Sequence, residues 1–415
     1  MAGQKHVSIF PTFFMSGFEC STFHWGRDRR RDLADETKHY EHADGDYAIL
    51  AKHGFGVARE GIPWPLVDSG NGYDFSAIQP FLEAQRKHKV LPIWDLCHYG
   101  YPDRLDPFDP AFTEVFVDYC RAAAEHVVPN SPGPHYFTPM NEMTFFGYMG
   151  GQWAWAAPYG KSKEEAHELR MALVRATIAG VKAIREVAPE ARMVHVDPVI
   201  NVVAPLDRPD LVEAAEHESN DEAYFCWDVL CGKKHPELGG SHEVLDIIGA
   251  NCYSFGQMEL TEEGPGKALE PGDPRIRPVC DLLMDVWERY GHPMIVAETS
   301  GLNEGRDDWL RDIMEESLSA VRRGIDLHAV CLFPLVDMPD WHTGEWLHNG
   351  FCDLIGPNLV RVPYEPFAQE LQRWQKLLNR ATELDEDPLS DPVDLEDVVR
   401  AAKELTHLQS DANWH

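Results

Sequence analysis

The chain has 415 residues, of which 44% are hydrophobic, so it can bury a substantial core. Its 69 acidic residues outnumber 37 basic ones and give a formal net charge of −32. This balance argues against nucleic acid or an anionic membrane surface as a partner, because both require a basic footprint. No run of about 18 apolar residues predicts a membrane span, and the first ten residues lack the pattern of a secretory signal peptide.

Nine cysteines are scattered along the chain, an odd number that does not suggest a disulfide framework. Without a secretory signal, they are typical of reduced thiols in a cytoplasmic protein. No Cys-x-x-Cys pair is present, so we expect no structural zinc site. The sequence therefore predicts a cytoplasmic protein with no metal or cofactor, and it leaves a homo-oligomer open.

Short apolar runs and helical patterns alternate along the chain. Eight runs have the composition of strands: Val7–Phe14, Gly56–Arg59, Val90–Leu96, Tyr136–Met140, Arg192–Pro198, Asp246–Tyr253, Met294–Glu298 and His328–Val336. The helical patterns are Tyr47–His53, Ala77–His88, Ala111–Val128, Glu164–Val187, Ala223–Leu230, Pro278–Tyr290, Trp309–Arg323 and Glu365–Leu378. Strands that alternate with helices predict a parallel sheet.

Eight such units predict an α/β fold, a single (β/α)8 TIM barrel with extended loops. An open doubly wound sheet is the alternative, but no Gly-x-Gly-x-x-Gly follows the first strand. We expect the barrel to span residues 1–380. Residues 381–415 are expected to form an acidic C-terminal extension, helical or partly disordered, because Glu383–Asp387 and Asp391–Asp397 are acidic and poor in aromatic residues.

Polar residues follow several predicted strands, at the end of a barrel where reacting groups lie. They are Glu19, Arg59, Asp95, His98, Asn141, Glu142, Asn251, Tyr253, Glu298, Asp337, Asp340 and Trp341. Taken singly, each has an ordinary structural explanation, but together they suggest glycoside hydrolysis, which uses two carboxyl groups across the scissile bond. Glu142 and Glu298 follow strands on opposite sides of the barrel, so they can converge. Arg59 and Tyr253 can keep a neighbouring carboxylate ionised.

Spaced motifs over Phe10–Trp374 resemble glycoside hydrolase family 1, which is β-glucosidase-like and belongs to clan A of the barrel glycosidases. The motifs are Arg59–Trp64, His98–Pro102, Thr138–Glu142, Asp246–Tyr253, Ile295–Gly301 and Leu335–Trp341. The resemblance implies a retaining β-glycosidase of small β-glycosides, with Glu142 as general acid/base and Glu298 as nucleophile. It further implies sugar binding by Glu19, His98, Asn141, Tyr253, Asp340 and Trp341, with Arg59 and Asn251 in support.

The chain departs from the family pattern mainly around the sugar. Glu19 stands where the family usually has Gln, Phe333 where it has Trp, and Asp340 where it has Glu. These changes leave the catalytic pair intact, but the identity of the sugar stays open. The segment after Trp341 lacks the Lys typical of members that act on 6-phosphosugars, so we disfavour a phosphosugar.

Three alternatives remain beside hydrolysis: a transglycosidase with the same glutamates, a barrel that binds carbohydrate without catalysis, and a metal-dependent barrel hydrolase. The last is disfavoured because no His-x-His follows the first strand. The aromatic-rich segment Met143–Tyr159 is expected either to stack on an aglycone or to pack on the barrel rim. The run Arg27–Arg31 is interpreted as intramolecular ion pairs rather than a site for an anionic leaving group.

Overall fold

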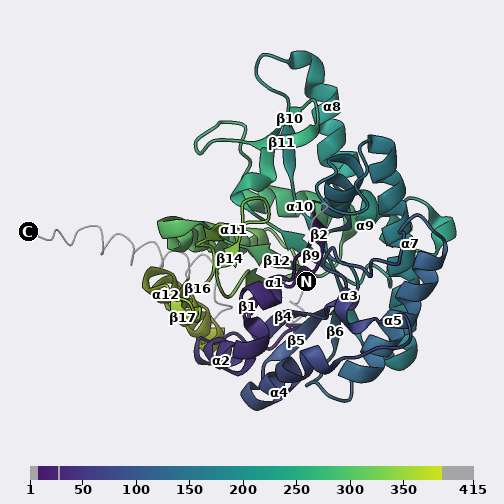
Figure 1. Cartoon of the computed structure of the whole chain (residues 1–415). Helices are drawn as coiled ribbons and strands as arrows, with labels where there is room; N and C mark the ends of the chain where they lie inside the picture. The colour runs from purple at the N-terminus through teal and green to yellow at the C-terminus, as the bar shows by residue number, and fades with distance from the viewer. Residues whose placement is uncertain (1–7, 27–28, 386–415) are drawn as a thin grey trace, which may run out of the picture.

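Eight parallel strands close into a barrel in the computed structural model, which describes residues 8–26 and 29–385 (Figure 1). In order around the barrel they are β1 (Phe14–Gly17), β13 (Leu327–Leu332), β12 (Met294–Thr299), β9 (Ile247–Asn251), β7 (Arg192–Pro198), β6 (Tyr136–Thr138), β5 (Leu91–Asp95) and β4 (Val57–Gly61). The ring closes because β1 pairs in parallel with both β13 and β4. The predicted (β/α)8 fold is confirmed.

Helices surround the barrel (Figure 1). The main ones are α2 (His39–Lys52), α4 (Gln79–His88), α5 (Ala111–Val127), α7 (Lys163–Val187), α9 (Phe225–Leu230), α10 (Val279–Tyr290), α11 (Arg306–Arg322) and α12 (Glu365–Asp385). Each predicted helical pattern falls on one of them. Helix α7 begins after Ser162, whose hydroxyl accepts the Glu165 N–H at 3.1 Å and satisfies a donor of the first turn.

Helix α12 continues to Asp385, past the boundary predicted at residue 380. The rest of the predicted acidic extension, 386–415, lies outside the described residues. The division into a barrel and an extension therefore stays a prediction.

The first strand was predicted too early in the chain, because β1 begins at Phe14, the residue where the predicted strand ends. Ile9 and Phe10 lie instead against the barrel interior: the Tyr136 hydroxyl donates to the Ile9 carbonyl at 2.6 Å, and the Phe10 and Tyr136 rings are 4.7 Å apart. Pro11, which has no N–H to give to a strand ladder, follows them. The apolar composition of this segment reflects burial at the base of the barrel rather than strand pairing.

Insertions after several barrel strands surround the mouth of the barrel. After β6, α6 (Met143–Phe146) runs directly into the π-helix η2 (Gly147–Gln152). A small sheet of β8 (Asn201–Val203), β10 (Gln257–Thr261) and β11 (Gly264–Ala268) projects with α8 (Val212–His217) from the barrel (Figure 1). Three two-stranded pairs complete the insertions: β2 (His24–Trp25) with β3 (Arg29–Arg30), β14 (Met338–Pro339) with β15 (Trp346–Leu347), and β16 (Cys352–Ile355) with β17 (Val360–Pro363).

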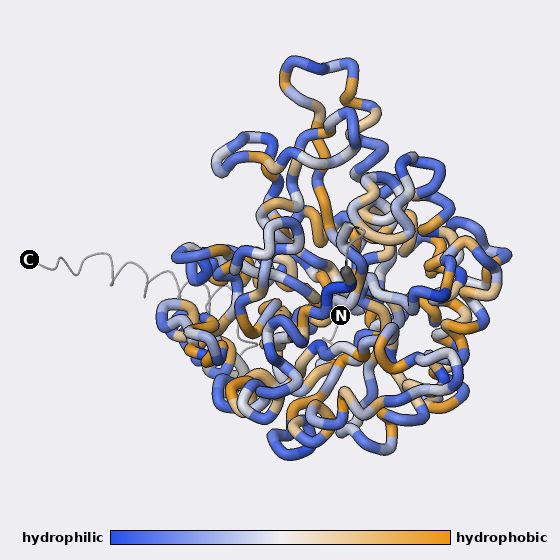
Figure 2. The backbone as a smooth tube through the Cα atoms, viewed as in Figure 1, coloured by the Kyte–Doolittle hydropathy of each residue, from blue (hydrophilic) through white to orange (hydrophobic). Residues whose placement is uncertain are grey.

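Apolar side chains form two layers, one inside the barrel and one between the strands and the helices. Met15, Val57, Ile93, Val194 and Ile295 are fully buried in the inner layer. Hydrophilic segments predominate at the periphery (Figure 2). Among the described residues, no helix is long and apolar enough to cross a membrane.

Candidate active site

Two buried glutamates lie at the mouth of the barrel, where the carboxyl ends of the strands meet. Glu142 follows β6 and Glu298 lies in β12, and both line a pocket of about 540 Å³, hereafter the central pocket. Glu142 has a left-handed backbone with φ of 42°, and its N–H donates to the Val196 carbonyl of β7 at 3.0 Å. A non-glycine residue in this conformation costs about 1–3 kcal/mol, and such positions gather at functional sites.

Glu298 accepts a hydrogen bond on each carboxylate oxygen. Arg59 Nη1 donates to Oε1 at 2.5 Å, and the Tyr253 hydroxyl donates to Oε2 at 2.9 Å. Arg59 is itself held by Asp95 and Asn141, whose oxygens lie 3.0 and 2.8 Å from Nη2. These two donors fix the orientation of the Glu298 carboxylate, and a carboxylate held in this way can act as a nucleophile.

Glu142 has a different environment, in which no arginine of the described residues pairs with it. Asn251 Nδ2 donates to Oε1 at 2.7 Å, and the Tyr99 hydroxyl donates to Oε2. Burial, helped by the charge of Glu298, raises the pKa of Glu142 to about 7, although both hydrogen bonds oppose the rise. A carboxyl group with this pKa can give a proton and take one back near neutral pH. Two carboxyl groups in one site thus have environments suited to different roles.

The predicted sugar-binding residues Glu19, His98 and Asn141 form one connected group. Asn141 Nδ2 lies 3.1 Å from His98 Nε2, and the same His98 atom lies 3.8 Å from Glu19 Oε1. Glu19 also accepts the Ser21 N–H at 3.1 Å, and burial raises the pKa of its carboxyl group. Glu19 and His98 line the central pocket, whereas Asn141 is fully buried between His98 and Arg59. In this arrangement, Asn141 orients its neighbours.

Asp340 and Trp341, predicted to bind outer sugar hydroxyls, both line the central pocket. Asp340 Oδ1 accepts the N–H groups of His342 and Thr343 at 2.9 and 2.7 Å, so this oxygen caps a local turn. Trp341 Nε1 is buried with no hydrogen-bond partner among the described residues. One oxygen of Asp340 is therefore already committed, whereas the Trp341 indole N–H has no partner among the described residues.

Aromatic rings line much of the central pocket. The aromatic-rich segment Met143–Tyr159 begins with α6 and η2, which together span residues 143–152. Phe145, Tyr148, Trp153 and Trp155 line the pocket, and the Trp153 and Trp155 rings lie 4.5 Å apart. Part of the segment therefore faces the pocket and part of it packs in the core, where Phe146 is fully buried, while stacking on an aglycone stays a prediction.

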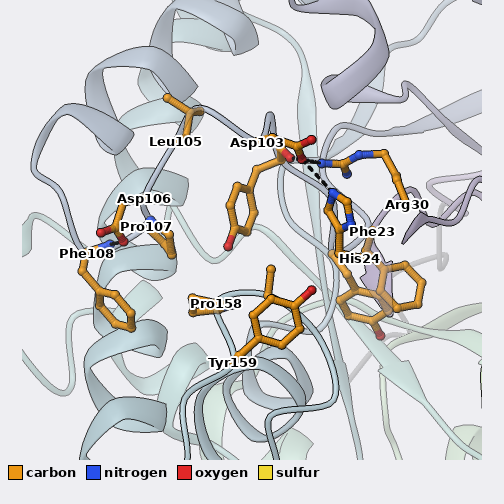
Figure 3. Close-up of a pocket in the computed structure, with 13 residues that line it drawn as sticks. Phe23, His24, Arg30, Asp103, Leu105, Asp106, Pro107, Phe108, Pro158 and Tyr159 are labelled. Atoms are coloured by element: carbon orange, nitrogen blue, oxygen red, sulfur yellow. Dashed lines mark hydrogen bonds and ion pairs between the residues drawn. The ribbon is translucent and has the colours of Figure 1, made fainter. Parts of the chain in front are cut away.

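A second pocket of about 530 Å³, hereafter the side pocket, is shown in Figure 3. Tyr99 lines both this pocket and the central pocket. His24 and Arg30 converge on Asp103 at its edge, with His24 Nε2 2.9 Å from Oδ1. Arg31 pairs with Glu36 at 2.5 Å. The ion-pair interpretation of the run Arg27–Arg31 is confirmed for Arg30 and Arg31, whereas residues 27–28 lie outside the described residues.

Tyr99 is the site residue that sequence analysis missed. It follows His98 directly, and its backbone is left-handed with φ of 61°. That turn directs a hydroxyl onto Glu142, which strand periodicity cannot predict. The signal available in the sequence was a polar aromatic residue directly after His98, within the motif His98–Pro102.

Two groups of side chains within the described residues have ligand types that suit a metal ion. They are Cys20 with Asp95 and His98, and Asp337 with His348 and Asp353. In each group an arginine already pairs with a carboxylate: Arg59 with Asp95 at 3.0 Å, and Arg306 with Asp353 at 2.8 Å. A cation would meet that positive charge, so neither group is a favourable metal site.

Comparison with known proteins finds that this chain is similar to glycosidases. No protein-family model matches the chain. The aryl-phospho-β-D-glucosidase BglC of Bacillus subtilis is 22% identical over 389 residues, covering 75% of this chain and 80% of that protein. A Thermotoga maritima β-glucosidase in complex with glucoimidazole superposes with a TM-score of 0.73 at 16% identity, covering 89% of this chain and 99% of that one.

A family 1 β-glucosidase from Thermotoga maritima superposes with a TM-score of 0.69 at 16% identity, covering 82% of this chain and 87% of that one. The chain resembles glycoside hydrolase family 1. The predicted resemblance is thereby confirmed, and at this level of identity the solved structures show a shared barrel fold.

Proposed function

We propose that this protein is a glycoside hydrolase, a retaining β-glycosidase that acts on small β-glycosides by double displacement. The matches to glycosidases support the enzyme class. The observation that carries the proposal is the contrast between the two glutamates in one pocket. Glu298 contacts Arg59 and Tyr253, whereas burial and the charge of Glu298 raise the pKa of Glu142 to about 7.

In the first half-reaction, Glu298 attacks the anomeric carbon while Glu142 gives its proton to the leaving oxygen. Arg59 and Tyr253 hold the Glu298 carboxylate in place through one hydrogen bond to each of its oxygens. In the second half-reaction, the Glu142 carboxylate takes a proton from water while the water oxygen attacks the anomeric carbon. The bond between the sugar and Glu298 breaks, and Glu298 leaves as a carboxylate.

A neutral sugar suits the central pocket better than a phosphosugar. Among the described residues that line it, none is Lys or Arg, and four are carboxylates: Glu19, Glu142, Glu298 and Asp340. A phosphate group binds to the cationic side chains of Lys and Arg or to helix N-termini, and it is repelled by carboxylates. We therefore expect a neutral glycoside here, although the Bacillus subtilis relative is named a phospho-β-glucosidase.

The test is covalent trapping of the glycosyl-enzyme intermediate. We expect 2,4-dinitrophenyl 2-deoxy-2-fluoro-β-D-glucoside, or another 2-fluoro sugar if glucose is not the glycone, to label Glu298, as located by peptide mass spectrometry. Glu298→Gln should remove both the label and turnover. Glu142→Gln should spare kcat/KM for substrates with activated leaving groups, because their first step needs little help from an acid, whereas kcat should fall because the second step loses its base.

Glu304→Gln, an exposed carboxylate in the turn after β12, serves as the matched control and should label like the parent protein. Turnover without any labelled carboxylate, or a label on a residue other than Glu298, would overturn the proposed mechanism. Binding of glycosides without turnover across a broad panel would favour the catalytically inactive barrel.

A further inference from the structure

Tyr99 lies between Glu142 and the aromatic walls of both pockets. Its hydroxyl donates to Glu142 Oε2 and receives a longer hydrogen bond, 3.4 Å, from Asn141 Nδ2. Its ring is 3% exposed. Edge-to-face contacts with Phe146 and Trp341, each 5.6 Å between centroids, fix the plane of the ring. The hydroxyl therefore has one direction and one carboxylate as its acceptor.

The two donors to Glu142 differ in chemistry. Asn251 presents an amide N–H, which can only donate, whereas a tyrosine hydroxyl can donate or accept. The charged form of the carboxyl group gains most from both bonds, because hydrogen bonds to an ionised acceptor are the stronger ones.

We propose that Tyr99 is a positioning residue that holds the Glu142 carboxyl group at Oε2 and stabilises its ionised form during the second half-reaction. This inference rests on the proposed function, in which Glu142 is the acid in the first step and the base in the second. As the base, Glu142 must be ionised and aimed at water. Tyr99 meets both needs, because its donation favours the carboxylate and fixes the rotation of the group.

Other titratable groups also face Glu142 and must be counted in any pH test. They are His98 from the segment after β5, Asp197 on β7, Tyr253 after β9 and Glu298 on β12. None of them donates a hydrogen bond to Glu142 in the described part of the chain, so removal of the Tyr99 hydroxyl leaves Asn251 as the donor.

Tyr99→Phe is the decisive variant because it deletes the hydroxyl and keeps the ring contacts. Glu142 works as an acid when protonated, so kcat/KM falls as pH rises through its pKa. Loss of a bond that favours the ionised form raises that pKa, and the alkaline limb should move up by about one pH unit. With 2,4-dinitrophenyl β-D-glucoside, whose first step is fast, kcat should fall about tenfold because the second step loses its positioned base.

Tyr101→Phe is the matched control. It makes the same chemical change two residues along, and Tyr101 lines the side pocket without contacting either glutamate. Its pH profile and kcat should equal those of the parent protein. A purely structural role for Tyr99 predicts no shift of the alkaline limb, so an unmoved limb in Tyr99→Phe would overturn the inference. Thermal unfolding, compared with that of Tyr101→Phe, shows whether Tyr99→Phe folds. If it does not, Tyr99→Trp takes its place as the test variant, because it also removes the hydroxyl.

A second measurement separates this inference from the proposed function. The Glu142 carboxyl carbon is followed by NMR in protein labelled with 13C-carboxyl glutamate and assigned with Glu142→Gln. Its titration should move to higher pH in Tyr99→Phe even if no glycoside is turned over. Absence of turnover by the parent protein would thus defeat the proposed function alone, whereas an unchanged titration would defeat the role of Tyr99.

Discussion

Arg59 and Glu298 form a buried ion pair that joins β4 to β12, with Nη1 2.5 Å from Oε1. Both side chains are almost fully buried, so little solvent screens the pair. The same guanidinium contacts Asp95 and Asn141, which ties the Glu142 side of the pocket to the Glu298 side.

Arg59→Lys should therefore be severely damaging even though charge is retained. A lysine has one compact head group and cannot replace a planar fork that bonds Glu298, Asp95 and Asn141 together. We expect kcat/KM for an aryl glycoside to fall at least about 100-fold, and the free energy of unfolding in urea to fall by about 3 kcal/mol because buried carboxylates lose their partner. Arg175→Lys, on the exposed face of α7, should change neither value. Near-normal activity in Arg59→Lys would contradict this role.

The rate should depend on pH through Glu142, whose pKa burial and the charge of Glu298 raise to about 7. The acid form works in the first step, so kcat/KM for an alkyl glycoside should be steady just below this pH and fall tenfold per unit well above it. An activated aryl glycoside, which needs little acid, should show a weaker fall. Initial rates between pH 5 and 9 measure the pH dependence for both substrates. The fall of kcat/KM above about pH 7, the alkaline limb, should disappear in Glu142→Gln. A limb that persists there would assign it to another group.

The free energy of unfolding should also depend on pH through the raised pKa of Glu142. A carboxyl group whose pKa is raised on folding binds more protons in the folded than in the unfolded chain, so stability falls as pH rises from about 4.5 to about 7. Glu142→Gln removes that loss, on the order of 3 kcal/mol. Urea unfolding should show the variant more stable than the parent at pH 8, with the advantage much reduced at pH 4.5. An advantage that is equal at both pH values would contradict burial of an ionised Glu142.

Trp155 provides a test of the aromatic wall. It lines the central pocket, lies beside the tilted ring of Trp153 and is 37% exposed, so it can contact an aglycone at little cost in packing. Trp155→Ala should raise KM for a 4-nitrophenyl glycoside about tenfold, with kcat little changed, because the contact is made equally before and during reaction. Trp346→Ala, at an exposed tryptophan that does not line the pocket, is the control. A methyl glycoside, which has almost no aglycone, should keep its KM in Trp155→Ala. If its KM rises by the same factor as that of the 4-nitrophenyl glycoside, Trp155 does not contact the aglycone.

The sequence predicted the barrel because its evidence is local. A strand inside a closed parallel barrel reads as a short apolar run, and an outer helix such as α7 shows one apolar face; both patterns survive without knowledge of neighbours. The prediction of the first strand was wrong for the same reason, because it also rested on local composition. Ile9 and Phe10 are apolar because Tyr136 and the barrel floor bury them, and composition alone does not distinguish burial from pairing.

Sequence spacing also placed Glu142 and Glu298 at the ends of their strands, because the carboxyl ends of all parallel strands meet at one mouth. Their different environments could not be predicted in this way. The bond from Tyr99 to Glu142 depends on a left-handed backbone at residue 99, and the partial loss of Asp340 to a turn depends on the chain at 342–343.

The sequence by itself thus determined the fold class, which follows from periodicity, and the two strands that carry Glu142 and Glu298, whose roles as a catalytic pair are implied by the family resemblance. Only the tertiary structure decided which carboxyl group is paired with an arginine and which is left with neutral donors. That division depends on side chains from β4, β5, β9 and β12 meeting in one buried space, where distance and desolvation, rather than sequence position, set the charge of each group.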